Sequence, residues 1–246
     1  AEVSAAAAVE LRRCARPAGL FVAWELPSPA TGELAGVAVS PAPGRALYFP
    51  FRGNGQVLDG IPAELAEWLL DPTRPKVVHE ANAAITALAR RGVGLRGIVG
   101  DTAAASYLSE PLELLPHDVD QVAKRWLKRA VPGRVAVTGQ GKRALPLSQV
   151  PAGRTGAWSC ALADAIGSTW PILHGNASPS MHQHLVERDR PLCQTLARMS
   201  VAGIGVDADA LQSASDDFAH LRELAEQDIH DLAGHAFNVS SPKQLA

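Results

Sequence analysis

Asp207–Gly234 reads DADALQSASDDFAHLRELAEQDIHDLAG, and Phe237–Leu245, which follows closely, reads FNVSSPKQL. Apolar residues recur every three or four positions in the first stretch, so they share one side of a helix. They are Leu211, Ala214, Phe218, Leu221, Ala225, Ile229 and Leu232. Asp207 suits the start of this helix and Gly234 its end, because these residue types cap helices. The pattern predicts one long helix between these two caps.

A second helix is predicted to begin at the end of the sequence. Ser241 suits its N-cap, Pro242 suits its first position, and Gln244 completes a capping box. A capped start without a helix body is a poor chain end. We therefore expect the natural chain to continue beyond Ala246.

The composition is typical of a globular protein with a substantial core. The 246 residues are 47% apolar and have a net charge of −2. No apolar run is long enough to cross a membrane, and three cysteines without a CxxC pair favour free thiols in a reducing cytoplasm. The Ala-rich opening lacks the order of a signal peptide, so residues 1–18 are expected to be a linker or chain edge.

Strands and helices alternate through the middle of the chain. Three strands come first, as an antiparallel meander, at residues 19–26, 36–39 and 46–49. Later strands alternate with helices, which implies parallel strands joined by helical crossovers. These later strands are 76–79 and 97–99, and the helices are 61–70, 81–91, 101–108, 118–129, 156–173 and 180–201. Residues 131–150 contain many glycines and prolines and are expected to form a loop.

Several motifs in the chain point to one protein family. Residues 92–108 fit the pattern G-x-x-L-x-G-x-x-x-DT-x-x-ASYL, Gly139–Lys142 is similar to a GKGK loop, and residues 237–245 fit FN-x-x-SPKQL. Together with AGIGVD at 202–207, these motifs resemble bacterial DNA polymerase I of family A. The resemblance implies an α/β fold with an RNase H-like mixed sheet of the DEDD exonuclease type and helices, followed by a long thumb helix.

The resemblance also implies the domain organisation. Residues 19–190 correspond to the 3′–5′ exonuclease-like domain, and residues 191–246 correspond to the truncated start of the polymerase thumb. Proofreading enzymes of this family hold two divalent metals with four acids. Those acids lie in a D-x-E strand motif, an N-x-x-x-D helix motif and a Y-x-x-x-D motif.

Three of the four acid positions are apolar in this chain. Ala23 replaces the Asp of the first motif and only Glu25 remains there, while Ala84 replaces the Asp of the second. Trp158 and Leu162 replace the Tyr and Asp of the third. One carboxylate cannot offset the repulsion between two dications. We therefore expect an inactive exonuclease domain without catalytic residues, metal or other cofactor.

Nearby acids provide the alternative of a rebuilt metal site. Glu80 adjoins the second motif and Asp164 lies two residues beyond Leu162. We expect Glu80 to cap a helix or face solvent, Asp164 to lie on a helix surface, and Asp101 to cap a helix. An active proofreading exonuclease stays open as the alternative to the inactive domain.

The chain offers two candidate DNA contacts. In this family the thumb approaches the minor groove of primer–template DNA, which implies backbone contacts by Asn238, Ser241 and Lys243; capping alone is the competing interpretation. Lys243 lies in the first turn of a helix, where free amide groups favour anions. Separately, residues 121–154 contain eight basic residues and no acidic one. This basic tract either attracts phosphates or is a solvated surface.

The resemblance implies that the parent protein is a DNA-directed DNA polymerase of replication and repair, in the cytoplasm and associated with the nucleoid. Its partner would be primer–template DNA, without a membrane, and we expect a monomer. Its polymerase site, which would use Mg²⁺, and its 5′ nuclease domain would lie outside these residues. A stand-alone DNA-binding or partner-docking module is the third interpretation, which a natural stop codon after Ala246 would support.

Overall fold

The computed structural model describes residues 2–14, 16–25, 28–53, 55–57, 61–111 and 117–245. The chain divides into two compact units, Ala1–Ala202 and Gly203–Ala246. The boundary lies later than the expected one at residues 190 and 191. The reason is that helix α9 (Arg190–Ala202) packs on helix α3 (Ala81–Ala89) and buries Ala197 within the first unit.

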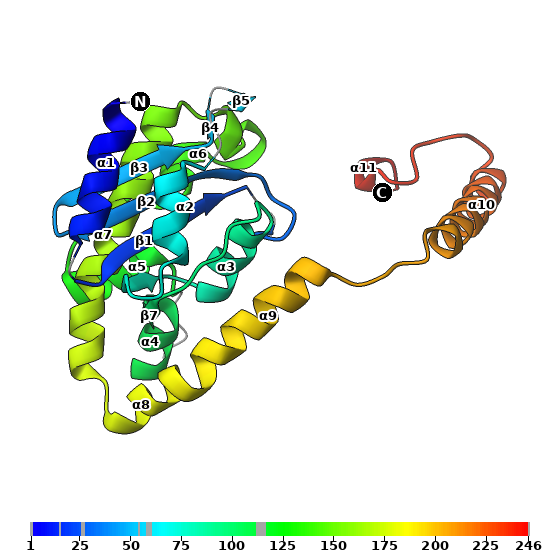
Figure 1. Cartoon of the computed structure of the whole chain (residues 1–246). Helices are drawn as coiled ribbons and strands as arrows, with labels where there is room; N and C mark the ends of the chain where they lie inside the picture. Colours follow the sequence, from blue (N-terminus) through cyan, green and yellow to red (C-terminus); the bar gives the residue numbers. More distant parts are fainter. Residues whose placement is uncertain are drawn as a thin grey trace. The chain divides into compact units, whose positions relative to one another are not determined.

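A five-stranded sheet forms the centre of the first unit, with strand order β3-β2-β1-β6-β7 (Figure 1). Its strands are β1 (Ala18–Trp24), β2 (Leu34–Ala42), β3 (Arg45–Pro50), β6 (Lys76–Val78) and β7 (Ile98–Asp101). The first three pair in antiparallel fashion, whereas β6 is parallel to both β1 and β7. The predicted meander and the predicted parallel strands are both confirmed. A separate hairpin pairs β4 (Arg52–Gly53) with β5 (Gln56–Val57).

Helices cover both faces of this sheet. Side chains alternate along β1, so that Leu20 and Val22 join a core cluster with α1, α2 and α3, whereas Ala23 joins a cluster with α4, α5 and α7 (Figure 1). The helices are α1 (Glu2–Arg13), α2 (Ala63–Leu70), α4 (Thr102–Ser109), α5 (Val119–Val122), α6 (Val135–Thr138), α7 (Ala152–Asn176) and α8 (Pro179–His184), besides α3 and α9. The mixed α/β architecture agrees with the fold expected from the sequence.

The N-terminal segment differs from the linker expected at residues 1–18. Most of it forms helix α1, and Ala7, Leu11 and Cys14 are buried in the first core cluster. Alanine has the highest helix propensity, and an Ala-rich run therefore becomes a helix once Leu11 can be buried.

Two other segments differ from the prediction: residues 118–129 form a less regular helix, and residues 131–150 contain more helical turns. The helix expected at 118–129 is split into α5 and a π-helical turn at Ala123–Leu127, followed by Lys128 in the left-handed region. The loop expected at 131–150 contains α6 and two short 3₁₀ turns, Gly141–Arg143 and Leu147–Gln149.

Helix α7 crosses the sheet at close range because two glycines face each other. A Cβ atom on Gly19 of β1 would lie 2.0 Å from the carbonyl oxygen of Ala163. A Cβ atom on Gly167 of α7 would lie 3.1 Å from the Gly19 nitrogen. Any side chain at Gly19 would push α7 away from β1.

The carboxylate of Asp101 joins β7 to the first turns of two helices. Its Oδ1 accepts hydrogen bonds from the amides of Ala103 and Ala104, at 2.9 and 3.4 Å, which confirms the predicted cap of α4. It also accepts from the amides of Glu80, at 3.0 Å, and Ala81, at 2.7 Å, at the start of α3. Glu80 is in the left-handed region, with φ of 57°. One side chain therefore satisfies amides that two helices leave unpaired.

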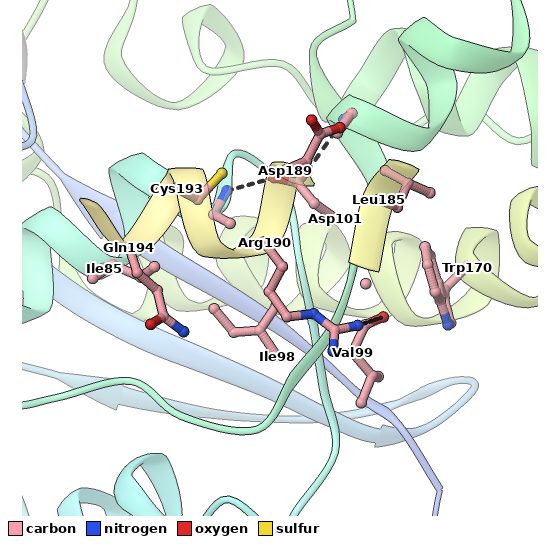
Figure 2. Close-up of a pocket in the computed structure, with 13 residues that line it drawn as sticks. Ile85, Ile98, Val99, Asp101, Trp170, Leu185, Asp189, Arg190, Cys193 and Gln194 are labelled. Atoms are coloured by element: carbon pink, nitrogen blue, oxygen red, sulfur yellow. Dashed lines mark hydrogen bonds between the residues drawn. The ribbon is translucent and has the colours of Figure 1, made fainter. Parts of the chain in front are cut away.

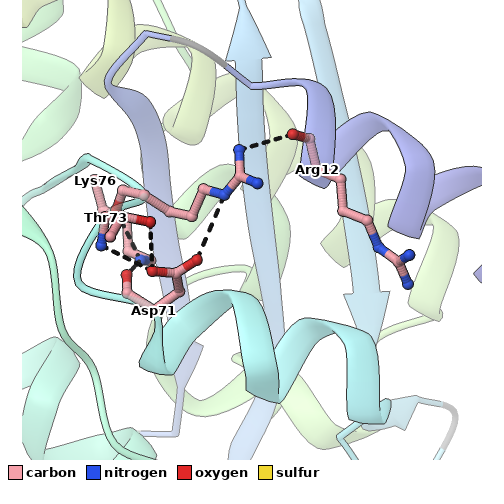
Figure 3. A network of polar contacts seen from close by, with 5 residues as sticks. Arg12, Asp71, Thr73 and Lys76 are labelled. Carbon is pink, nitrogen blue, oxygen red and sulfur yellow. Dashed lines mark hydrogen bonds and ion pairs between the residues drawn. The ribbon is translucent and has the colours of Figure 1, made fainter.

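Lys76 of β6 is fully buried and forms no ion pair with a carboxylate of the described residues. Its Nζ donates hydrogen bonds of 2.9 Å to the carbonyl oxygens of Asp71 and Arg74 (Figure 3). The same Nζ lies 4.5 Å from the centre of a Trp68 ring. Burial, together with the charge of Arg74, lowers the pKa of Lys76 to about 8, although the charge of Asp71 opposes this.

The loop around Lys76 also ties α1 to the sheet. The Arg74 Nη1 atom donates a 2.7 Å hydrogen bond to the carbonyl oxygen of Arg12, in the last turn of α1, and its Nε lies 3.5 Å from Asp71 Oδ2 (Figure 3). Hydrogen bonds from Thr73 lower the pKa of Asp71. Arg74 thus satisfies a carbonyl group at a helix end, where intrahelical partners run out.

The second unit consists of α10 (Ala208–Ala233) and α11 (Pro242–Leu245). Both predicted caps of the long helix are confirmed: Asp207 Oδ1 accepts from the Ala210 amide at 2.9 Å, and Gly234 has φ of 72°. The predicted capping box differs in its partner. Gln244 Oε1 accepts from the amide of Asn238, at 2.7 Å, rather than from that of Ser241.

We predict that Asp101→Ala lowers the free energy of unfolding of the first unit by about 2–3 kcal/mol, because two helix caps are lost at once. Urea titration followed by tryptophan fluorescence measures this, since all 5 tryptophans lie in the first unit. Ser178→Ala, which removes the single 3.3 Å cap of α8, is the matched control and should cost less than about 1 kcal/mol. Equal losses in the two variants would contradict a double cap.

We predict that the stability difference between the wild type and Lys76→Met rises with pH between 8 and 10.5. The folded lysine loses its proton near pH 8, whereas the unfolded one keeps it to about 10.5, so the unfolded chain binds more protons in this window. The expected gain is about 3 kcal/mol, because each pKa unit corresponds to about 1.36 kcal/mol, with no further gain above the window. Comparing the two proteins cancels the effect of Tyr48, whose pKa burial raises. A flat difference would show that Lys76 is not titrated there.

Candidate functional site

The residues at the expected metal-ligand positions are buried in the first unit. Ala23 is on β1 and is fully buried, and Ala84 is on α3 and is 2% exposed. Leu162 is on α7 and is 4% exposed. Ala23 and Leu162 pack in one core cluster, and Ala84 packs in the other. Three positions that would have to present carboxylates are therefore part of the hydrophobic core.

A cleft of about 510 Å³ opens next to these positions. Trp158 and Leu162 line it, but Ala23, Glu25 and Ala84 are not among the described residues of its wall. The charged part of the wall consists of Glu80, Asp118, Asp120 and Arg134, with Trp24 beside them. The structure thus brings the third motif to a cleft and leaves the remaining ligand positions out of it.

Glu25, the retained acid, makes structural contacts. Its Oε1 accepts a 2.7 Å hydrogen bond from the amide of Leu147, and its Oε2 accepts a 3.0 Å bond from the amide of Ser148. Arg134 Nη2 lies 3.8 Å from Oε1, and Arg134 Nη1 also donates to the carbonyl oxygen of Trp24 at 3.0 Å. Sequence spacing gave no signal for these contacts, because 122 residues separate Glu25 from Leu147. The carboxylate anchors the 3₁₀ turn at Leu147–Gln149.

Trp158 lies at the position where the resemblance implies a tyrosine. Its indole Nε1 donates a 3.0 Å hydrogen bond to the carbonyl oxygen of Pro132, and its ring meets Phe21 edge to face at 5.2 Å. The side chain is 5% exposed. A buried indole with a satisfied N–H group stabilises the wall of the cleft, and it offers no oxygen to a metal or to water.

The acids of the cleft do not combine into a metal site. In the described ranges, no three His, Cys, Asp or Glu side chains are grouped so that they would hold a metal ion. Partial burial raises the pKa of Glu80, and the charges of Asp101 and Asp118 act in the same direction. Burial lowers the pKa of His79, whose Nδ1 lies 2.9 Å from the Thr102 hydroxyl. Without a nearby cation, these shifts favour the neutral forms of both side chains.

Asp164 differs from the surface residue expected from the sequence. It is buried at 9% exposure, accepts a 2.8 Å hydrogen bond from the amide of Gly44, and forms a 2.9 Å ion pair with Arg129. Helix periodicity alone did not indicate that this side of α7 faces the turn between β2 and β3. Asp164 stabilises that turn and does not line the cleft.

A second cavity, beside Asp101, is too small to bind a ligand. Its volume of about 30 Å³ corresponds to the space of a water molecule (Figure 2). Its walls include the apolar side chains of Ile98 and Trp170, and Arg190 closes one side through a 3.1 Å hydrogen bond to the carbonyl oxygen of Val99. Burial raises the pKa of Cys193 at its edge, which keeps this thiol protonated.

The three candidate DNA-binding residues lie at the end of the second unit. Asn238 uses its side chain to accept a 3.0 Å hydrogen bond from the amide of Ser240, which forms a local turn. Ser241 is half-buried and donates its amide to the Asn238 carbonyl oxygen at 2.9 Å. The side chain of Lys243 lies outside the described residues. The contacts in the structure are those of a turn, and the DNA contact stays a prediction.

We predict that Glu25→Gln lowers the free energy of unfolding by about 1–3 kcal/mol, because an amide NH₂ group would face a backbone donor and the charge opposite Arg134 would be lost. Glu67→Gln, on the exposed side of α2, is the control and should change little. Adding 10 mM Mg²⁺ should leave the stability of the wild type unchanged, whereas a Glu25 metal site would make it rise in a way that Glu25→Gln abolishes.

The chain is similar in sequence to proteins of a known family. Residues 50–153 match the family described as DNA polymerase I, ribonuclease H-like domain. The chain is 34% identical over 187 residues to DNA polymerase I of Bacillus caldotenax, which covers 74% of this chain and 20% of that protein. It is 32% identical over 229 residues to DNA polymerase I of Mycobacterium bovis, with 88% and 24% coverage. The chain spans 20% to 24% of the length of these relatives.

Solved structures agree with this relationship. The POL domain of Pol1 from M. smegmatis, in complex with DNA primer-template and dNTP, is similar with a TM-score of 0.65 and 27% identity, covering 99% of this chain and 38% of that one. NrnC of Brucella melitensis has a TM-score of 0.61 at 14% identity, covers 78% of this chain and 89% of its own, and shows the fold alone. Over most of its length, the chain is thus a homologue of part of bacterial DNA polymerase I, with the ribonuclease H-like domain of that family at residues 50–153.

Proposed function

We propose that this chain is a non-catalytic 3′–5′ exonuclease-like domain joined to the start of the thumb of a bacterial DNA polymerase I. The main observation behind the proposal is that Ala23, Ala84 and Leu162, at three of the four acid positions, are all buried and apolar. A carboxylate at any of them would have to leave water for the hydrophobic core. The fourth acid, Glu25, holds backbone amides instead of a metal.

The proposed role of the whole protein is template-directed DNA synthesis in replication and repair. Its polymerase site, with Mg²⁺ as cofactor, would lie outside these residues. Primer–template DNA is the proposed partner, gripped by the thumb with Asn238, Ser241 and Lys243 as backbone contacts. The M. smegmatis relative was solved with a DNA primer-template, which supports this partner. None of the described helices is long and apolar enough to cross a bilayer; we propose a cytoplasmic, nucleoid-associated monomer.

An active proofreading exonuclease is the second candidate, because Glu80, Asp118 and Asp120 line one cleft. It would need at least two of these acids to hold cations about 4 Å apart. In the described part of the chain, no three His, Cys, Asp or Glu side chains are grouped so that they could hold a metal ion, which argues against this arrangement.

We predict that the purified chain does not trim a 5′-labelled single-stranded oligonucleotide from its 3′ end in Mg²⁺ or Mn²⁺. Losing metal stabilisation of several kcal/mol corresponds to a rate at least about a thousandfold below that of a family member with all four acids, which is the positive control. Denaturing gel electrophoresis measures the products.

The variant Glu80→Gln/Asp118→Asn/Asp120→Asn separates the possible sources of any trimming. Metal-dependent trimming by the wild type that disappears in this variant would refute the proposal and establish a rebuilt site. Trimming that is equal in both proteins would identify a co-purified nuclease.

A further inference from the structure

A second cleft, of about 300 Å³, lies between helix α4 and the segment formed by α5 and the π-helical turn at Ala123–Leu127. Its wall is rich in hydrogen-bond donors, and it includes His117, Gln121, Lys124, Arg125 and Lys128. Glu110 is the acid among the described residues of the wall, and it forms an ion pair with Arg125. The cleft therefore has a net positive charge.

The backbone around this cleft departs from regular helix where the lysines lie. The sequence predicts a continuous helix over residues 118–129, but the structure has a π-helical turn at Ala123–Leu127 and then Lys128 at φ 53° and ψ 31°. Both features are unfavourable for an ordinary side chain, and both are frequent at functional sites. They bring Lys124, Arg125 and Lys128 to the wall of one cleft.

Four of the five arginines in the basic tract contact carboxylates or a backbone carbonyl, whereas the side chains of Lys124 and Lys128 have no such partner among the described residues. Arg129 pairs with Asp164 at 2.9 Å, Arg134 faces Glu25, and Arg154 donates to a backbone carbonyl. The side chains of Lys124 and Lys128, in contrast, form no hydrogen bond or ion pair with any described residue. Two ammonium groups without a counter-charge on one wall repel each other unless an anion binds between them.

Helix α5 separates acidic from basic surface. Asp118 and Asp120 line the larger cleft, whereas Gln121, Lys124 and Lys128 line the smaller one. Because of this segregation, an anion approaching the smaller cleft meets few acids on its wall. Flexible ammonium groups with three donors each suit phosphate groups, which they bind as point charges.

We propose that this basic cleft binds backbone phosphates of a single DNA strand. The inference rests on the proposed function, which gives the protein DNA as its partner. It adds a contact away from the thumb, on the exonuclease-like domain itself. Lys124 and Lys128 would each neutralise a phosphate. Gln121 also lines this cleft, but its Nε2 donates a 2.9 Å hydrogen bond to Asp120 Oδ2.

The test measures binding of a fluorescently labelled 20-nucleotide oligothymidine to the chain by anisotropy, over 50–300 mM salt. For Lys124→Gln/Lys128→Gln we expect at least about tenfold weaker binding at 100 mM salt and a salt slope smaller by about 1.4, since each single-strand phosphate contact contributes about 0.7. Lys142→Gln/Arg143→Gln is the matched control, because both side chains are exposed in the same tract and lie outside the cleft. The control should change neither value.

Lys128→Gly distinguishes a binding role from a structural one. Glycine tolerates the left-handed region, so this variant should unfold at a higher urea concentration and yet bind the oligonucleotide more weakly. Three results would refute DNA binding in this cleft. They are no binding by the wild type, an unchanged salt slope in Lys124→Gln/Lys128→Gln, or an equal loss of affinity in both double variants.

Oligonucleotide binding that depends on Asn238 or Lys243 alone would also refute binding in the basic cleft. It would support the proposed DNA contact of the thumb. The trimming assay under the proposed function does not depend on these lysines, so the two proposals fail separately.

Discussion

The carboxylate of Asp101 is the contact on which the arrangement of the exonuclease-like domain depends. It stands at the end of β7 and accepts amides from the first turns of both α3 and α4. Helix α3 contains Ala84, and α4 contains Ser106, which lines the basic cleft. A buried amide without a partner costs about 1–3 kcal/mol, so this single side chain fixes two helices beside the edge of the sheet.

Buried apolar side chains occupy three of the expected ligand positions, whereas Glu80, Asp118 and Asp120 line the large cleft. Alanine and leucine at three ligand positions belong to the hydrophobic core, and the indole of Trp158 is held by Pro132. Glu25 accepts hydrogen bonds from the backbone amides of Leu147 and Ser148. Apolar residues at the other three positions avoid the repulsion that clustered carboxylates suffer without cations.

Acidic and basic side chains lie on different sides of α5, which the net charge of the chain does not show. The net charge of the chain is −2, and the basic tract is a continuous stretch of sequence. In the fold, its arginines neutralise Glu25, Glu110 and Asp164, which come from three different elements. The side chains of Lys124 and Lys128 have no partner among the described residues of this wall, and Asp118 and Asp120 line the other cleft. The positive surface is therefore local, and the electrostatic attraction it exerts on phosphates is short in range at physiological salt.

The sequence by itself determined the elements whose signals are local. The periodicity of apolar residues predicted the strands and α10. The cap residues Asp101, Asp207 and Gly234 predicted helix ends. The spacing of the motifs identified the apolar residues at the expected ligand positions. Only the tertiary structure decided which side chains meet across long separations. It buried α1, Lys76 and Asp164, paired Glu25 with residues over 100 positions away, and split a predicted helix into α5 and a π-helical turn. Local sequence patterns determine which backbone conformation a segment prefers and which side chains share a face of a helix or strand. Burial and charge pairing depend on which elements pack together in space.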